Sequence, residues 1–272
     1  MTRININQIQ CIENQMLRET IDILNRNQIV FYLAFGSVLG AVRHGGPIPW
    51  DGDLDVLVPF PMFEKARICL EKELSDRFMV HGLHNDKKYN LVFPRVAISP
   101  HSSDVVHVDI FPLLGLPDSE TKQIEIFNRL NKKSEILRFK QFRRYIVNMS
   151  FVKNIIGSFI EQFCSPLSGK RLAKQYYDIV KDYPYEEANY VFSGTTCYGR
   201  KNILPKAVFG NPIMADYGSL KAPIPEKWDE YLKNYYNDYM KFPPKEEQEK
   251  GLAMTFDLND DDYEKIKDVI GE

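Results

Sequence analysis

Cysteine is scarce in this chain and never occurs in close pairs. The four cysteines, Cys11, Cys69, Cys164 and Cys197, are widely separated along 272 residues. This excludes a small fold built on disulfides and a zinc site of closely spaced cysteines. Scattered thiols of this kind fit a reducing compartment.

Long apolar runs are also absent. No stretch approaches the roughly 20 apolar residues that a membrane-spanning helix needs, and the first residues lack the apolar region of a secretory signal. The net charge is only −2, so a general attraction to nucleic acid is not expected. We therefore expect a cytoplasmic location, which includes the inner face of the cytoplasmic membrane, and no nucleic-acid partner.

The composition is that of a globular protein with a substantial core, at 44% hydrophobic and 26% charged residues. Helical and alternating patterns follow one another over the first ~115 residues, which is typical of an α/β or α+β fold with a mixed sheet flanked by helices. The expected helices are 8–26, 38–43 and 61–75, and the expected strands are 29–35, 78–81, 89–98 and 105–111. Pro112 and residues 115–117 are expected to end the last of these strands.

The pattern changes after residue 118. Residues 1–118 are predicted to form a catalytic core, and residues 119–272 a mainly helical, basic and aromatic lobe that packs on it and binds substrate or acceptor. The segment 129–153 carries eight lysines and arginines and one acid, Glu135. It could rest on an anionic membrane as an amphipathic surface, or simply be a helix with a solvated basic face.

Three carboxylates at alternating positions, Asp51, Asp53 and Asp55, follow a Gly36–Ser37 turn. Side chains two residues apart in a strand point to the same face, so Asp53 and Asp55 should share one face. Like charges placed together repel each other unless a cation lies between them. Oxygen ligands suit Mg²⁺ or Mn²⁺, so the pattern predicts a divalent-metal site.

A third candidate ligand, Asp109, lies in another predicted strand with the same apolar–Asp–apolar pattern. The backbone of a glycine-containing turn at the start of a helix can bind phosphate. Three carboxylates beside such a turn are typical of nucleotidyltransferase-type folds.

Several sequence blocks resemble the LicD family, which includes bacterial phosphocholine transferases and fukutin-related ribitol-phosphate transferases. These blocks are Gly36-Ser-Val-Leu-Gly-Ala-Val-Arg-His44, Ile48-Pro-Trp-Asp51, Asp53-Leu-Asp55, His107-Val-Asp-Ile-Phe-Pro-Leu113, Tyr236-Asn-Asp-Tyr-Met240 and Pro243-Pro244. The resemblance implies a nucleotidyltransferase-like fold. It also implies transfer of a phosphoalcohol from a CDP-linked donor to a sugar hydroxyl, with release of CMP.

The resemblance also suggests roles for individual residues. Asp53 and Asp55 would be metal ligands, and Asp109 either the third ligand or the base for the acceptor hydroxyl. The Gly36 backbone and Ser37 would hold the donor phosphates. Asp51 would bind a second ion or hold the turn.

Arg43 and Arg95 could pair with phosphate oxygens through their bidentate donors. Each could equally form salt bridges within the fold. Tyr198, Tyr236 and Tyr239 could line the donor pocket, or pack in the core as most aromatic residues do.

Two positions depart from the family pattern. Gly52 stands where the family often has an acid, and we expect it to face away from Asp53 and Asp55. Asn237 replaces a glycine, and asparagine tolerates left-handed backbone angles better than most residues.

The expected activity is metal-dependent transfer of phosphocholine, phosphoglycerol or phosphoribitol to a cell-surface glycan such as a teichoic-acid precursor, with Mg²⁺ or Mn²⁺ as cofactor. The partners would be a CDP-linked donor and a glycan acceptor on a lipid carrier. Two alternatives remain open. One is a nucleotidyltransferase that moves a nucleoside monophosphate onto a small molecule. The other is a non-catalytic relative that binds a glycan or nucleotide.

Overall fold

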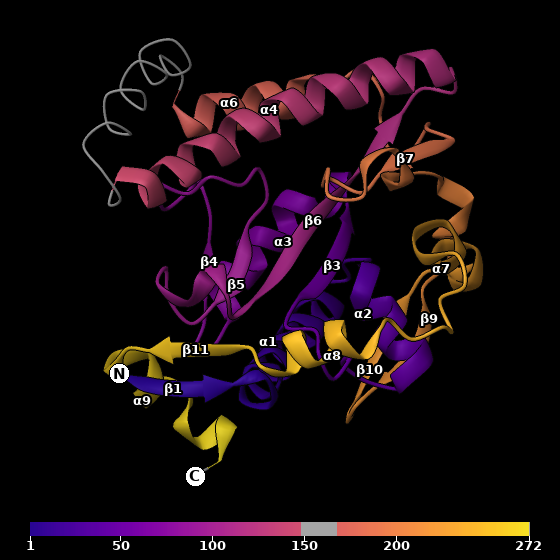
Figure 1. Ribbon diagram of the computed structural model, residues 1–272. Helices are drawn as coiled ribbons and strands as arrows, with labels where there is room; N and C mark the ends of the chain where they lie inside the picture. The colour runs from indigo at the N-terminus through magenta and orange to yellow at the C-terminus, as the bar shows by residue number, and fades with distance from the viewer. Residues whose placement is uncertain (148–167, 272) are drawn as a thin grey trace.

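A mixed β-sheet runs through the middle of the computed structural model, which describes residues 1–147 and 168–271 (Figure 1). Its central strands lie in the order β2-β3-β6-β5-β4, and β7 and β8 extend it from β6. The strands are β1 (Thr2–Asn5), β2 (Tyr32–Leu33), β3 (Leu54–Pro59), β4 (Met79–His81), β5 (Arg95–Ala97), β6 (His107–Leu116), β7 (Tyr190–Phe192), β8 (Ile203–Pro205), β9 (Ile213–Tyr217), β10 (Leu220–Ile224) and β11 (Thr255–Leu258).

Helices flank this sheet, which confirms the predicted fold class. They are α1 (Ile6–Arg26), α2 (Phe35–Leu39), the π-helical turn η1 (Gly40–His44), α3 (Phe60–Glu73), α4 (Glu120–Val147), α6 (Gly169–Asp178), α7 (Trp228–Tyr236), α8 (Lys245–Leu252) and α9 (Asp260–Ile270), with short 3₁₀ turns η2 (Ser102–Asp104), η3 (Gly199–Asn202) and η4 (Lys206–Val208).

The long first helix begins at a capping box. The Asn5 side chain accepts a hydrogen bond from the Gln8 backbone N–H, and the Gln8 side chain accepts one from the Asn5 N–H. These two bonds satisfy backbone donors that the helix cannot satisfy itself. Apolar positions such as Ile9, Ile12 and Met16 are fully buried, so the periodicity predicted both the helix and its inner face.

Strand lengths differ from the sequence expectation. The predicted strand 29–35 is reduced to β2, because Phe35 takes a φ of +44° and opens α2. The predicted strand 89–98 is reduced to β5. Conversely, β6 continues through Pro112 to Leu116.

The prediction that Pro112 ends the strand was wrong for a local reason. On one side β6 pairs with β3 along its length, from Val108 to Leu113. It also pairs with β5 up to Asp109 and with β7 from Leu114 onward. Pro112 lies in the gap between these last two pairings, where the missing N–H breaks no ladder bond to either strand.

The C-terminal half is mainly helical, with α4 and α6 lying side by side along one end of the sheet (Figure 1). Its small strands were not predicted: β9 and β10 form a hairpin, and β11 pairs with β1 near the N-terminus. Residues 139–153 of the basic segment lie outside the described side chains, so its membrane contact stays a prediction. The division into two lobes at residue 118 also stays a prediction.

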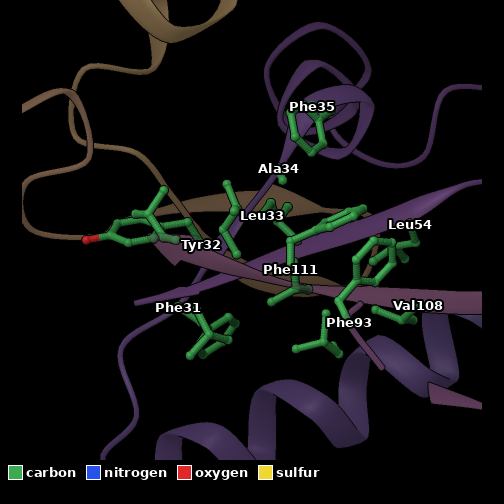
Figure 2. Packing of buried hydrophobic residues seen from close by; sticks show 14 of the residues in the cluster. Phe31, Tyr32, Leu33, Ala34, Phe35, Leu54, Phe93, Val108 and Phe111 are labelled. Atoms are coloured by element: carbon green, nitrogen blue, oxygen red, sulfur yellow. The ribbon is translucent and has the colours of Figure 1, made fainter. Parts of the chain in front are cut away.

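An aromatic core supports the centre of the sheet (Figure 2). The rings of Phe93 and Phe111 lie 4.2 Å apart, and Phe35 meets Phe111 edge-on at 5.7 Å. These residues fix the turn at Phe35 against the strand that carries Asp109. Within the described part of the chain, no helix combines the length and apolar character needed to cross a membrane.

Candidate active site

Two carboxylates lie side by side in the sheet. Parallel pairing of β3 with β6 places Asp55 directly beside Asp109. Residues paired in this way point to the same face of a sheet. Asp109 is buried, with 7% of its surface exposed. The two aspartates that the sequence predicted on separate strands are therefore neighbours.

Asp51 and Asp53 lie in the loop that enters β3. The Asp53 backbone N–H interacts with the Asp51 carboxylate and favours its charged form. Gln10 of α1 fixes this loop by donating to the carbonyls of Ile48 and Asp51, at 2.8 and 2.7 Å. Burial, followed by the charge of Asp53, raises the pKa of Asp51 to about 6.

The four carboxylates form one electrostatic cluster. Burial raises the pKa of Asp55 well above its ordinary value, and Asp109, Asp53 and Asp51 raise it further. A buried acid beside other acids resists ionisation unless a proton or a cation neutralises it. The arrangement therefore favours a positively charged ligand at this edge of the sheet.

Glu13 is a further acid at this cluster that sequence reasoning missed. It lies on α1 with 3% of its surface exposed, and one of its oxygens, Oε1, has no hydrogen-bond partner. Burial, then Asp53 and Asp51, raise its pKa well above the ordinary value, although it accepts a bond from the His107 backbone N–H. A signal was present: Glu13 falls between Ile9 and Met16 on the apolar stripe of the helix.

The Gly36–Ser37 turn holds the carboxylate strand. The Asp55 backbone N–H donates to Ser37 Oγ at 2.9 Å, and Ser37 is 1% exposed. A Cβ at position 36 would lie 2.7 Å from Asp51 Oδ2, so glycine leaves room for that carboxylate. The predicted contact of this turn with donor phosphates stays a prediction.

Both predicted arginines bind protein groups. The Nη1 group of Arg43 donates to the carbonyls of Tyr239 and Lys241, at 2.8 and 3.3 Å, and its guanidinium lies over the ring of Phe242. Arg95 donates from Nε to Asp109 Oδ1 at 2.6 Å. Arg95 thus forms the salt bridge that the sequence left open as an alternative, whereas Arg43 binds backbone carbonyls. Contact of either arginine with donor phosphate stays a prediction.

Two tyrosines, Tyr198 and Tyr236, lie near the carboxylates and form a tyrosine wall. The hydroxyls of Tyr198 and Tyr236 lie 3.1 Å apart, and the Tyr198 ring stacks on Phe35. Burial raises the pKa of both hydroxyls, and Asp55 and Asp51 contribute to the rise. Tyr239 instead donates to Asp229 on α7. The structure thus brings two of the three candidate tyrosines to the cluster.

The predicted metal site stays a prediction, and the donor atoms present can be compared with what a divalent cation needs. Among the described residues, no three histidine, cysteine, aspartate or glutamate side chains are arranged to hold a metal ion together. Mg²⁺, however, is commonly held by one or two carboxylates while substrate phosphates and water fill the remaining positions. Asp55 with a neighbouring aspartate provides such a pair, so the donor atoms fit an oxygen-loving cation.

Both departures from the family pattern have a local explanation. A Cβ at Gly52 would lie 2.8 Å from Met254 Sδ and 3.2 Å from Ile6 Cδ1, so a side chain there would run into the C-terminal segment. Asn237 adopts a φ of +56° with a ψ of −107°, a positive-φ turn conformation that glycine and asparagine take more readily than other residues.

The sequence of this chain is similar to those of known proteins. Residues 28–153 match the family model described as LicD/FKTN/FKRP, nucleotidyltransferase domain. The chain is 24% identical over 236 residues to the lipopolysaccharide cholinephosphotransferase LicD of Haemophilus influenzae, which covers 83% of this chain and 88% of that protein. It is also 31% identical over 107 residues to an uncharacterized protein of Rickettsia prowazekii. That match covers 32% of this chain and 40% of the relative. The family match contains the turn at Gly36 and the carboxylate cluster.

Proposed function

This chain belongs to the LicD family, and from that membership we propose that it transfers phosphocholine from a CDP-linked donor to a hydroxyl of a cell-surface glycan. The observation that carries the proposal is the pairing of Asp55 with Asp109 across β3 and β6, with Asp51 and Asp53 at the entrance of β3. The similarity to a lipopolysaccharide cholinephosphotransferase supports the choice of alcohol.

In the proposed reaction, the acceptor hydroxyl attacks the phosphorus that carries the alcohol. A new O–P bond forms, the bond to the CMP oxygen breaks, and the hydroxyl proton passes to a carboxylate, for which Asp109 is the candidate. Asp53 and Asp55 would hold Mg²⁺ or Mn²⁺, which neutralises charge on the phosphates when bound. Tyr198 and Tyr236 would border the donor.

The test is CMP release from CDP-choline, CDP-glycerol and CDP-ribitol, in Mg²⁺ and in EDTA. We expect metal-dependent CMP from one donor, which also names the alcohol. Asp53→Ala should abolish release, whereas Asp22→Ala, an exposed aspartate on α1, should leave it unchanged. CMP release in EDTA that equals the release in Mg²⁺ would contradict the proposal. Release by Asp53→Ala that equals the release by the wild type would also contradict it.

The alternative nucleotidyltransferase activity breaks a different bond and is separable in the same assay. It would release pyrophosphate from CTP and phosphocholine, and it would not release CMP from a CDP-alcohol. Binding of CDP-choline in EDTA that is unchanged in Asp53→Ala, without either product, would instead indicate a non-catalytic relative.

A further inference from the structure

One row of polar side chains crosses four neighbouring strands. Asp55 is paired with Asp109, Asp109 with Arg95, and Arg95 with His81, on β3, β6, β5 and β4 in turn. Directly paired residues point to one face of a sheet. The row therefore connects the candidate active site to a histidine two strands beyond Asp109.

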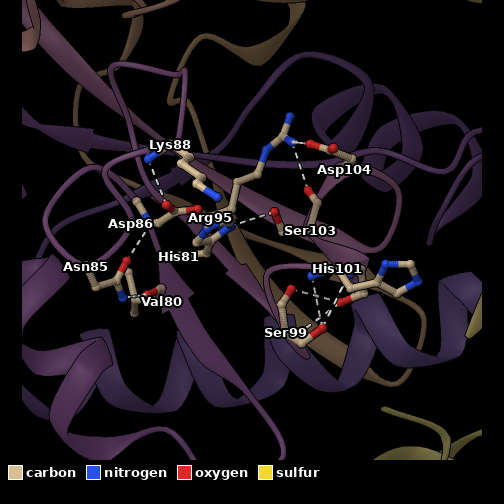
Figure 3. A network of polar contacts seen from close by, with 12 residues as sticks. Val80, His81, Asn85, Asp86, Lys88, Arg95, Ser99, His101, Ser103 and Asp104 are labelled. Atoms are coloured by element: carbon tan, nitrogen blue, oxygen red, sulfur yellow. Dashed lines mark hydrogen bonds and ion pairs between the residues drawn. The ribbon is translucent and has the colours of Figure 1, made fainter. Parts of the chain in front are cut away.

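Arg95 is held at three points. Its Nε donates to Asp109 Oδ1 at 2.6 Å, and its Nη1 donates to the Ser103 carbonyl at 2.8 Å and lies 3.6 Å from Asp104 Oδ1. Figure 3 shows the guanidinium directed at the η2 turn that carries Ser103 and Asp104. The Arg95 and Asp109 side chains are 14% and 10% exposed, so solvent screens this pair little.

His81 holds the turn behind Arg95. Its Nδ1 lies 2.7 Å from Ser103 Oγ, and its Nε2 lies 3.1 Å from Asp86 Oδ2 (Figure 3). Because a carboxylate only accepts, Nε2 carries the proton that faces Asp86, while Nδ1 shares a hydrogen bond with the Ser103 hydroxyl. Asp86 also accepts a bond from the Lys88 backbone N–H at 2.7 Å.

The order Ser–His–Asp resembles a hydrolytic triad, but the arrangement excludes that chemistry. Ser103 is 1% exposed and His81 5% exposed, so no substrate reaches the hydroxyl. The ring is also reversed, since a triad uses Nε2 toward serine and Nδ1 toward aspartate. These contacts fit a structural role: His81 binds Ser103, and Ser103 in turn binds Arg95.

We infer that Arg95, supported by Ser103 and His81, is a positioning residue that fixes the carboxylate of Asp109 for the transfer reaction. The inference rests on the proposed function. Asp109 stands beside Asp55, and two adjacent carboxylates repel each other. Arg95 binds Asp109 Oδ1, which also lies 3.5 Å from His107 Nε2, and the Ser103 carbonyl holds the other side of the guanidinium. A misplaced reacting group lowers the rate even when the substrate still binds.

The first test compares Arg95→Lys with Arg67→Lys. Lysine keeps the charge but, with a single ammonium, cannot reproduce the fork that joins Asp109 to the Ser103 carbonyl. Arg67 is a matched control, because its half-buried guanidinium pairs with Glu64 and Glu71 on α3. We expect kcat for CMP release to fall by about 10- to 100-fold in Arg95→Lys, with donor KM nearly unchanged. Arg67→Lys should retain kcat.

The second test asks whether His81 acts through Ser103. Asparagine can place a polar atom near the Nδ1 position and keep the Ser103 contact, whereas glutamine reaches the Nε2 position and keeps the Asp86 contact. We expect His81→Asn to retain more of kcat than His81→Gln at matched melting temperatures. Ser103→Ala, which removes the hydroxyl but not the carbonyl, should resemble His81→Gln.

The outcomes separate the inference from the proposed function. Arg95→Lys with the kcat of Arg67→Lys overturns the role of Arg95. Loss of kcat that merely follows melting temperature in both His81 variants overturns the role of His81. If the wild type releases no CMP from any donor, the proposed function fails, and crystal structures decide the inference. A carboxylate of Asp109 that turns away in Arg95→Lys supports it, and an unmoved one overturns it.

Discussion

Two roles are open for the Ser37 hydroxyl: holding β3, or binding donor phosphates. They predict different effects of Ser37→Ala. Its Oγ accepts a bond from the Asp55 N–H in a buried environment. Ser37→Ala leaves that N–H without its partner, so we expect a loss of about 1–3 kcal/mol in the free energy of unfolding. Chemical denaturation measures this loss. If Ser37 acted only on donor phosphates, stability would be kept and the Kd for CDP-choline would rise.

Glu13 makes stability depend on pH. Its pKa is raised well above the ordinary value, so the folded protein keeps a proton that the unfolded chain releases. The stability that this proton provides is full below the unfolded pKa and is lost as pH rises through the folded pKa. Glu13→Gln is neutral at every pH, so in EDTA we expect the variant to lose less stability than the wild type on going from about pH 5 to about pH 8.

The control for this experiment is Glu125→Gln, since Glu125 is exposed on α4 and should leave the pH profile unchanged. Melting temperatures at both pH values are the measurement. A Glu13→Gln profile parallel to that of the wild type would show that Glu13 does not carry the effect.

At the scale of elements, η1 is tied to the segment after α7 by Arg43. The guanidinium binds the carbonyls of Tyr239 and Lys241, close to Tyr236 and the tyrosine wall. We expect Arg43→Ala to speed amide hydrogen exchange across residues 237–242, because the contacts that hold this turn are lost. Arg18→Ala, which removes an exposed contact to Ser219, should not.

The same variant separates the two interpretations of Arg43. If it binds donor phosphate, Arg43→Ala weakens donor binding while exchange in residues 237–242 stays as in the wild type. Faster exchange, with a smaller change in donor Kd, indicates the positioning contact.

The sequence predicted those elements whose pattern is local. The stripe of α1 and the alternation around Asp55 and Asp109 identify a helix and two strands without knowledge of their neighbours. Strand ends depended on tertiary contacts: β6 continues past Pro112 because of where β5 and β7 end. The strands β1 and β11 pair across almost the whole chain, and short segments carry no signal for such a partner.

The candidate site was predictable to the same degree. Alternation indicated Asp55 and Asp109, but only the register of β3 against β6 shows that they are adjacent. Arg95 was a candidate for phosphate, and its partner Asp109 is fixed by the register of β5. Glu13 was missed because its place on the apolar stripe of α1 marks it as unusual but does not show which groups face it until the helix is docked.

For the molecule as a whole, the acidic cluster links stability, pH and the proposed cation. The pKa of Asp51 is raised to about 6, and those of Asp55 and Glu13 are raised well above their ordinary values. Without a cation, the folded protein must keep protons that the unfolded chain releases from about pH 4 upward, so stability falls as pH rises.

A divalent cation that binds these carboxylates replaces the protons, and by mass action it stabilises only the folded state. We therefore expect Mg²⁺ or Mn²⁺ to raise the melting temperature less at about pH 5 than at about pH 8, where protons compete less for these carboxylates. Thermal unfolding in EDTA and in each metal measures the effect. Asp53→Ala should lose most of it, while Asp22→Ala should keep it. A shift that is equal at both pH values, or equal in both variants, would place the cation away from this cluster, because only binding at these carboxylates competes with their protons.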